Sequence, residues 1–162
     1  MSTVTLSQRA AAPADLPALL AMMADFNRLE GIEFDARRFE PALRKLIADP
    51  SLGLVCLLSA AHEQRANSGY FVLSWGYDLE WGGRGAVLTE LSLTPVQRGR
   101  RLGREAMRLV EEAARAGGAG ALHLAVRPEK APARRLYESA GFADPKRLLM
   151  TKELARSSRS TL

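Results

Sequence analysis

The stretch of sequence that decides the fold is LSLTPVQRGRRLGREAM, residues 91–107. An apolar run ends at Pro95, an arginine-rich turn with Gly99 and Gly103 follows, and an amphipathic helix then begins. The N-terminus of a helix presents unpaired N–H groups and a partial positive charge, and glycine lets the backbone approach a ligand closely. This order of strand, turn and helix therefore predicts a phosphate-binding site.

Two common phosphate-binding loops do not fit this turn. A P-loop requires a lysine and then a serine or threonine after its last glycine, whereas Gly103 is followed by Arg104 and Glu105. A dinucleotide fingerprint requires the spacing G-x-G-x-x-G, and the turn has a single wider gap. The spacing alone is also compatible with a solvated basic turn, so the rest of the chain has to decide between the two.

Length and composition predict one globular domain. The chain has 162 residues, of which 47% are hydrophobic and 25% are charged. We expect a single domain over residues 1–154 and a polar, disordered tail over residues 155–162. No apolar run approaches the roughly 20 residues that span a bilayer, and no signal peptide is evident. We therefore expect a cytoplasmic protein that does not contact a membrane.

The net charge of +5 is compatible with a nucleic acid, a membrane surface or a polyanionic small molecule as partner. The arginines gather at residues 98–104 and 127–135. Because the first cluster lies in the glycine turn, a compact phosphate-bearing ligand is favoured and no nucleic acid is expected. Cys56 is the only cysteine and lies in an apolar run, which predicts a buried thiol in a reducing compartment. No His/Cys cluster has metal-ligand spacing.

Hydrophobic periodicity predicts the element order β-α-α-β-β-β-α-β-α-β. The predicted strands cover residues 3–8, 52–58, 69–75, 86–93 and 121–126, with a last strand within residues 145–154. Of the four predicted helices, the first follows Asp15 and the second begins at Asp35 or Glu40. The other two cover residues 102–116 and 131–140. Residues 76–85 are predicted to be a loop or an irregular strand end. The middle strands form antiparallel hairpins, and the strand–helix–strand unit is parallel. The fold class is α/β (α+β), a mixed, mostly antiparallel sheet with helices on both faces.

Two motifs in the right order resemble those of the GCN5-related N-acetyltransferase (GNAT) superfamily. Residues 98–103, RGRRLG, are similar to the acetyl-CoA signature of that family, with Arg101 at the place of its first glycine. Residues 130–142, KAPARRLYESAGF, are similar to its later Asn-x-x-Ala-x-x-Leu-Tyr and Gly-Phe motif, with Lys130 in place of the asparagine. The element order also matches over residues 3–154. The resemblance implies a GNAT-like fold.

The same resemblance implies where acetyl-CoA binds. The family's coenzyme lies between a splayed strand and the helix that follows the glycine turn. Carried over residue by residue, the implied coenzyme-binding residues are Leu91, Ser92, Leu93, Arg98, Gly99, Arg100, Arg101, Leu102, Gly103, Arg104, Lys130, Ala133, Arg134 and Tyr137. A side chain at Arg101 narrows the approach of the pyrophosphate, and Gly99 with the neighbouring arginines can compensate.

Acetyl transfer to an amine requires a base, because an amine is mostly protonated at neutral pH. Glu90 is the candidate base, because a charged residue inside an apolar strand costs free energy and therefore indicates a function. The alternative is a sheet-face carboxylate paired with an arginine. Strict alternation places Glu90 with Leu88 on one face and Leu91 on the other. By resemblance, Tyr137 is the acid that protonates the leaving thiolate, and the alternative is a packed helical tyrosine.

Carboxylates and aromatic side chains in two regions predict a site for a cationic amine. The candidate substrate-binding residues are Phe26, Glu30, Tyr77, Asp78 and Glu80, with Asp25, Glu33 and Trp81 nearby in sequence. We expect an acetyl-CoA-dependent N-acetyltransferase that acts on a small-molecule amine. A protein N-terminus or lysine as acceptor, and a non-catalytic CoA-binding or regulatory module, stay open as alternatives. Dimers are common in the family, so a homodimer is also possible.

Overall fold

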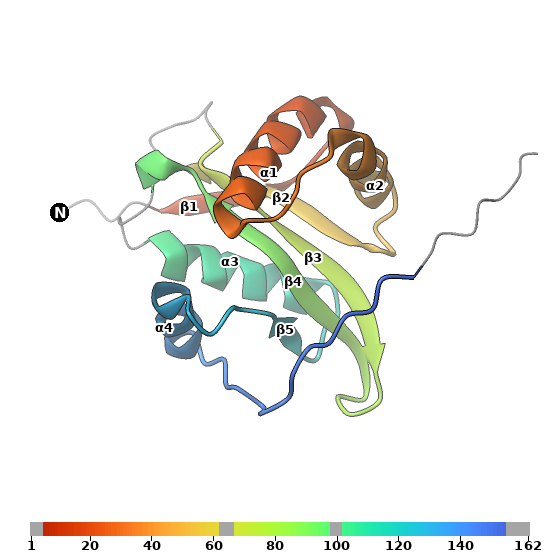
Figure 1. Cartoon of the computed structure of the whole chain (residues 1–162), viewed down its shortest axis with the longest axis vertical. Helices are drawn as coiled ribbons and strands as arrows, with labels where there is room; N and C mark the ends of the chain where they lie inside the picture. The colour runs from red at the N-terminus through yellow and green to blue at the C-terminus, as the bar shows by residue number, and fades with distance from the viewer. Residues whose placement is uncertain (1–4, 62–66, 98–101, 155–162) are drawn as a thin grey trace, which may run out of the picture.

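The computed structural model describes residues 5–61, 67–97 and 102–154 (Figure 1). The strands are β1 (Leu6–Ala10), β2 (Gly53–Ala60), β3 (Gly69–Asp78), β4 (Gly83–Leu93) and β5 (Leu122–Leu124). The helices are α1 (Leu16–Glu30), α2 (Ala36–Ala48), α3 (Leu102–Ala116) and α4 (Ala131–Ser139), with short 3₁₀ turns at Pro13–Asp15 and Pro95–Gln97. Within the described ranges, none of the helices combines the length and the apolar character needed to cross a bilayer.

The strands form one mixed sheet in the order β1-β2-β3-β4-β5. The first four strands are antiparallel neighbours along the chain, whereas β4 and β5 are parallel because α3 carries the chain back between them. The predicted sheet class is therefore confirmed. β5 occupies one edge of the sheet and β1 the other.

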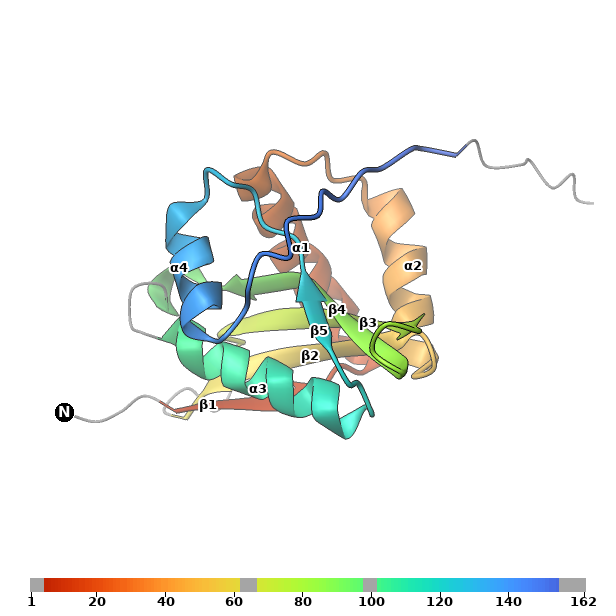
Figure 2. The ribbon, with the colours of Figure 1, turned by 90° about the horizontal axis from the view of Figure 1, so that it is seen from below.

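Helices cover both faces of the sheet (Figure 2). α1 and α2 bury Leu19 and Leu43 against the face that carries Leu57 and Tyr70. α3 buries its apolar stripe, including Val110, against the opposite face. Each fully buried large side chain contributes about 1.5–3 kcal/mol to folding. Burial also confirms the structural interpretation of Cys56, since it raises the pKa of that thiol to about 11.

The structure decides between the sequence-based alternatives at two places and corrects the prediction at a third. Of the two interpretations of residues 76–85, a loop or an irregular strand end, the structure favours the strand ends, because β3 continues to Asp78 and β4 already begins at Gly83. The second helix begins at Ala36, with Pro41 inside it, because the Asp35 carboxylate accepts a hydrogen bond from the Arg37 N–H at 3.0 Å and caps the helix. Residues 145–154 contain no strand in the structure.

A β-bulge interrupts the pairing of β3 with β4. Val72 lies opposite Glu90 and Leu73 lies opposite Leu88, so Thr89 is an extra residue on β4. The bulge keeps Leu88 and Leu91 on the α3 face, although strict alternation would separate them. Glu90 shares the α1 face with Val72. The predicted grouping of Leu88 with Glu90 on one face is therefore wrong.

Candidate active site

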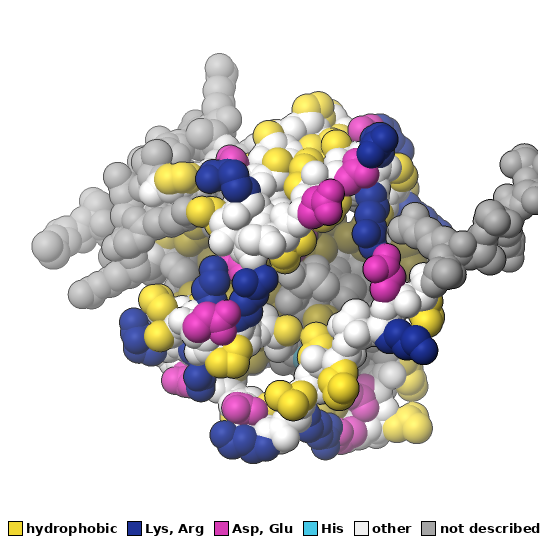
Figure 3. All heavy atoms as spheres, viewed as in Figure 1, with side chains coloured by type: hydrophobic (Ala, Val, Ile, Leu, Met, Phe, Trp, Pro, Cys, Tyr) yellow, Lys and Arg dark blue, Asp and Glu magenta, His cyan; other side chains and the backbone are white. Residues whose placement is uncertain are grey.

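The candidate site lies where β4 extends past the end of β5. The two strands pair only between Ala86–Leu88 and Leu122–Leu124. In the described part of the chain, residues 90–93 have strand partners on β3 alone. Ligands in α/β folds bind at such a place, beyond the carboxyl ends of parallel strands and beside a helix N-terminus. The space-filling view shows this face hollowed between α1 above and the α4 side below, with charged side chains on the rim (Figure 3).

Glu90 is held at this place by a tyrosine on the neighbouring strand. The Tyr70 hydroxyl donates a 2.6 Å hydrogen bond to a Glu90 carboxylate oxygen. Burial raises the pKa of Glu90 above its ordinary value, and the hydrogen bond from Tyr70 opposes part of that rise. The predicted alternative, a carboxylate paired with an arginine, is not seen among the described residues, where Glu90 is bonded to Tyr70. A half-buried carboxylate with a raised pKa suits a group that accepts a proton near neutral pH.

α1 brings two of the predicted acceptor-site residues to the same side. The Phe26 ring meets the Tyr70 ring edge to face, with 6.5 Å between centroids. The Glu30 carboxylate accepts a hydrogen bond from the Lys130 ammonium at 3.1 Å, and this contact joins the end of α1 to the start of α4. Phe26 and Glu30 lie four residues apart on α1, so they share one face of the helix.

Tyr137 on α4 is near the Glu30 end of that face. Burial raises the pKa of the Tyr137 hydroxyl, and the Glu30 charge raises it further. The ring packs edge to face against Phe142, with 6.0 Å between centroids. The hydroxyl therefore stays protonated across the physiological range and can donate a hydrogen bond or a proton. The raised pKa fits the predicted role of Tyr137 as an acid. The contact with Phe142 fits the alternative, a packed helical tyrosine.

The two sequence motifs contact each other at the start of α3. A Cβ on Gly103 would lie 3.0 Å from Cδ2 of Leu136, so glycine allows α4 to approach the first turn of α3. Leu102 is buried, and Arg104 is exposed beside it. On β4, the side chains of Leu91, Ser92 and Leu93 are half-buried, as is Ala133 on α4. The predicted residues Arg98, Gly99, Arg100 and Arg101 lie outside the described residues.

The predicted acceptor residues of the β3–β4 turn are placed elsewhere. Tyr77 is 80% exposed, and Asp78 pairs with Gly83 at the tip of the hairpin. The Glu80 carboxylate forms an ion pair with Arg147 at 2.8 Å. Glu90 lies roughly 23 Å along β4 from Gly83, at about 3.3 Å per residue. The structure therefore brings Phe26 and Glu30 to the Glu90 end of the sheet but leaves the three turn residues at the opposite end.

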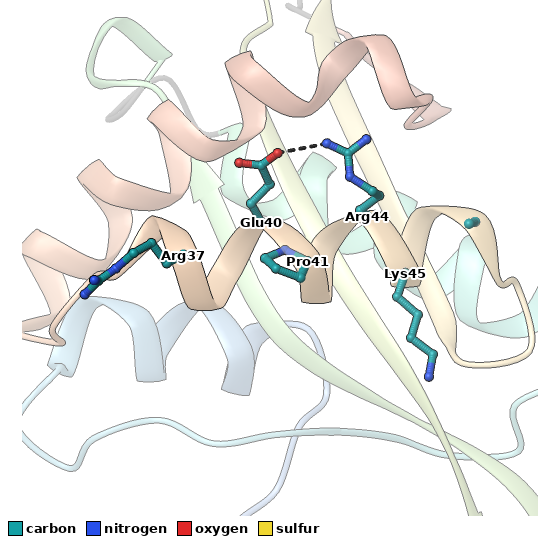
Figure 4. A pocket seen from close by; sticks show the side chains of 6 residues that line it. Arg37, Glu40, Pro41, Arg44 and Lys45 are labelled. Atoms are coloured by element: carbon teal, nitrogen blue, oxygen red, sulfur yellow. Dashed lines mark hydrogen bonds and ion pairs between the residues drawn. The ribbon is translucent and has the colours of Figure 1, made fainter. Parts of the chain in front are cut away.

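A shallow hollow on α2 does not resemble a reaction site (Figure 4). Its lining side chains are Arg37, Glu40, Pro41, Arg44, Lys45 and Ala48. The figure shows Arg37 and Lys45 pointing away from each other, and Glu40 is bonded to Arg44 at 2.8 Å. Separately, the described residues hold no group of three or more His, Cys, Asp or Glu side chains placed to bind a metal ion.

Tyr70 is the residue that sequence reasoning missed. It lies inside an apolar strand, where an aromatic residue is ordinary core material. Only the register of β3 against β4, including the bulge, brings its hydroxyl to Glu90. The sequence does place two polar groups, Tyr70 and Glu90, on strands that are neighbours in the sheet. The extra residue at the bulge means that counting residues along the two strands does not pair them.

The comparisons with known proteins point to one family. A model of the acetyltransferase (GNAT) family matches residues 19–142. A candidate acetyltransferase from Arthrobacter sp. FB24 is 30% identical with a TM-score of 0.75, over 91% of this chain and 96% of that one. An integron cassette protein from the metagenome of Cole Harbour Salt Marsh is 28% identical with a TM-score of 0.78, over 91% and 90%.

A more distant structure shows the fold alone. An aminoglycoside acetyltransferase from an uncultured soil metagenomic sample is 13% identical, with a TM-score of 0.75, over 93% of this chain and 97% of that one. No curated protein sequence gives a significant match.

Proposed function

This chain belongs to the acetyltransferase (GNAT) family, and on that premise we propose that it transfers an acetyl group from acetyl-CoA directly to a small cationic amine. The observation that carries the proposal is the half-buried Glu90 carboxylate, bonded to Tyr70 at 2.6 Å, at the open end of β4. Burying part of a charged group costs free energy, so a carboxylate in that position indicates a functional role. Removal of a proton from the acceptor amine is the role that fits it.

The described residues fit a coenzyme at the start of α3. Gly103 lets α4 pack closely on the first turn of α3 through Leu136, and the exposed Arg104 adds positive charge to the N-terminus of α3, where an anion is favoured. We assign the pyrophosphate to the turn that includes Gly103, and the pantetheine arm to the backbone of residues 91–93. When bound, acetyl-CoA supplies an activated thioester. The chain itself has to orient the acceptor, remove its proton and provide a proton for the thiolate.

The side chains divide these tasks. Glu90 takes a proton from the ammonium form of the acceptor, either directly or through a water. Tyr70 holds the Glu90 carboxylate in place by its hydrogen bond and is a positioning residue. Tyr137, kept protonated by burial, gives its hydroxyl proton to the departing thiolate. Proton transfer by a positioned group typically contributes 10²- to 10⁴-fold in rate, as an order of magnitude.

The acceptor class follows from the α1 residues. Glu30 provides a carboxylate that already holds one ammonium, that of Lys130, and the Phe26 ring lies on the same helix face. A carboxylate beside an aromatic ring suits a cationic amine. A peptide N-terminus or a lysine side chain is the rival acceptor, because both are also amines. Thiol release measured with small diamines, neutral amines and short peptides separates these classes.

Glu30→Gln is expected to raise KM for a small cationic amine about tenfold, since hydrogen bonds to charged groups contribute about 1.5–3 kcal/mol. The change in kcat should be small, because Glu30 binds the acceptor and does not move a proton. Glu40→Gln, a matched change on the outer face of α2, should leave KM unchanged. If Glu30→Gln alters KM for neutral and cationic amines alike, a charge-selective acceptor site at Glu30 is wrong.

Tyr70→Phe is expected to move the acid limb of the pH–rate profile to higher pH. Glu90 must be deprotonated to act as the base, so activity falls as the pH drops through its pKa. The Tyr70 hydrogen bond lowers that pKa, and its loss lets burial raise the pKa further. The measurement is kcat/KM against pH.

Thr89→Val is the matched control, because it removes a hydroxyl next to Glu90 that bonds to the Val72 carbonyl at 3.3 Å. Its acid limb should coincide with that of the unmodified protein. A Tyr70→Phe variant with lower activity but an unmoved acid limb would show that Tyr70 only supports packing.

A further inference from the structure

One ion pair joins the two helices that flank the candidate site. The Lys130 ammonium donates a hydrogen bond to the Glu30 carboxylate at 3.1 Å, across 100 positions of sequence. The two side chains are 37% and 28% exposed, so the pair is partly withdrawn from water but still reachable from it. Glu30 is the last residue of α1, and Lys130 directly precedes α4. The pair therefore connects the two sides of the hollow between these helices (Figure 3).

The end of α1 is a favourable place for a cation. Gly31 ends the helix in the left-handed conformation, with a φ of 67°. The carbonyl groups of the last helical turn carry a partial negative charge, which adds to the charge of the Glu30 carboxylate. That carboxylate also raises the pKa of the Tyr137 hydroxyl. A cation bound at Glu30 is therefore held within electrostatic reach of the proposed acid.

Lys130 is poorly placed to keep this position. It is the N-cap residue of α4, and its side chain makes no capping hydrogen bond in the described structure. The N-terminus of a helix carries a partial positive charge, which disfavours an ammonium there. Lys130 therefore gains from Glu30 but loses at its own helix. An ammonium that does not belong to the chain can take the same place on Glu30 without that loss.

The Glu30 position is linked to Glu90 through aromatic side chains. Phe26 precedes Glu30 by four residues, which is about 6 Å along the axis of α1. Its ring packs edge to face on the ring of Tyr70, and the Tyr70 hydroxyl is bonded to Glu90. The site thus has one carboxylate for the nitrogen that reacts and a second carboxylate further along α1, with aromatic surface on the way. Two carboxylates in this arrangement suit a small diamine.

We propose that Lys130 occupies, in the free protein, the place of a second ammonium of the acceptor, and that a diamine displaces it from Glu30 on binding. This inference rests on the proposed function and makes Lys130 a specificity-determining residue. Lysine suits the exchange, because its flexible four-carbon stem lets the charge withdraw while the backbone stays in place. A monoamine, whose single nitrogen lies at Glu90, leaves the Lys130–Glu30 pair intact. Lys130 therefore sets how much a second charge adds to the affinity.

The test is calorimetric binding of putrescine, a diamine, and of butylamine, the monoamine of the same length, to the full chain saturated with coenzyme A. Lys130→Met should lower Kd for putrescine roughly threefold or more, because it removes the competing ion pair, and should leave Kd for butylamine unchanged. Lys130→Arg should raise Kd for putrescine, because a guanidinium holds a carboxylate through two parallel hydrogen bonds. Lys45→Met, a matched change on the exposed face of α2, should alter neither value.

Three results would overturn the exchange. Equal tightening of putrescine and butylamine in Lys130→Met would show a general effect of net charge. A lower melting temperature with unchanged putrescine binding would show that the ion pair only fastens α4 to α1. Weaker binding of coenzyme A with unchanged putrescine binding would make Lys130 a coenzyme contact instead.

A double variant tests whether Glu30 is the group that is exchanged. In the Glu30→Gln background, Lys130→Met should no longer tighten putrescine binding, because the shared carboxylate is gone. Coenzyme A has no acetyl group to transfer, so the binding test does not depend on catalysis. Tighter putrescine binding in Lys130→Met without acetyl transfer by the unmodified protein would support the exchange and reject the proposed function. Unchanged putrescine binding in that variant, alongside acetyl transfer, would reject the exchange alone.

Discussion

Glu90→Gln is expected to lower kcat/KM for the amine by about 10²- to 10⁴-fold, the usual contribution of a positioned base. The amide keeps the shape of the side chain and can still accept a hydrogen bond from Tyr70, but it cannot take a proton. KM for acetyl-CoA should change little, because Glu90 lies on the α1 face of the sheet and not in the glycine turn. The acid limb of the pH–rate profile should disappear with the carboxylate.

The comparison for this variant is Glu112→Gln, which makes the same chemical change on the exposed face of α3, where Glu112 pairs with Arg108. It should retain full activity. A loss of less than about threefold in Glu90→Gln, well short of the usual contribution of a base, would assign the base role to another group. The carboxylate would then be a buried structural partner of Tyr70.

Tyr137→Phe is expected to lower kcat by about 10²-fold or more, again within the range for proton transfer. The ring and its edge-to-face contact with Phe142 remain, so the variant removes the hydroxyl alone. The raised pKa of Tyr137 keeps the proton in place over the working pH range, so no alkaline limb from this residue should occur below the ordinary tyrosine pKa.

Steady-state kinetics and thermal melting together decide the role of Tyr137. The proton donor role predicts a lower kcat, an unchanged KM for acetyl-CoA and an unchanged melting temperature. The packing role predicts the same kcat as the unmodified protein. A series of acetyl donors that differ in the acidity of the leaving thiol offers a further check, since a donor with a more acidic thiol should need the Tyr137 proton less and lose less rate in the variant.

The sequence alone predicted the parts of the fold that depend on local pattern. The glycine turn before α3 and the Leu136–Tyr137 motif on α4 were separate sequence features, and the structure places them in contact through Gly103 and Leu136. The order of elements along the chain followed from hydrophobic runs, because the central strands bury side chains under a helix layer on each face of the sheet. These inferences need only short-range spacing and burial.

The errors come from pairing between strands. The bulge at Thr89 changes which side chains share a face, and no local pattern reports an extra residue in one strand of a pair. The role of Tyr70 depends on that same register. The glycines of residues 76–85 left a loop and an irregular strand end open, and the register between strands decides for the strand ends, since the antiparallel ladder continues through Gly76 and Gly85.

The apolar pattern of residues 145–154 predicted a strand that the single chain does not contain. Leu148 is 90% exposed and Met150 is 87% exposed. A strand needs a neighbour, and sequence periodicity shows the capacity for pairing without showing the partner. The substrate-binding roles of Tyr77, Asp78 and Glu80 stay predictions, and their position at the hairpin tip separates them from the residues around Glu90.

The most direct test of acetyl transfer uses the purified full chain with acetyl-CoA that carries a labelled acetyl group. Binding of acetyl-CoA is measured first, and the label is then followed with and without a panel of small cationic amines. The proposed function predicts thiol release that depends on the amine, with the label recovered on the amine and with release nearly lost in Glu90→Gln. Acetyl-CoA binding without label transfer to any amine would contradict it and would favour a non-catalytic CoA-binding module.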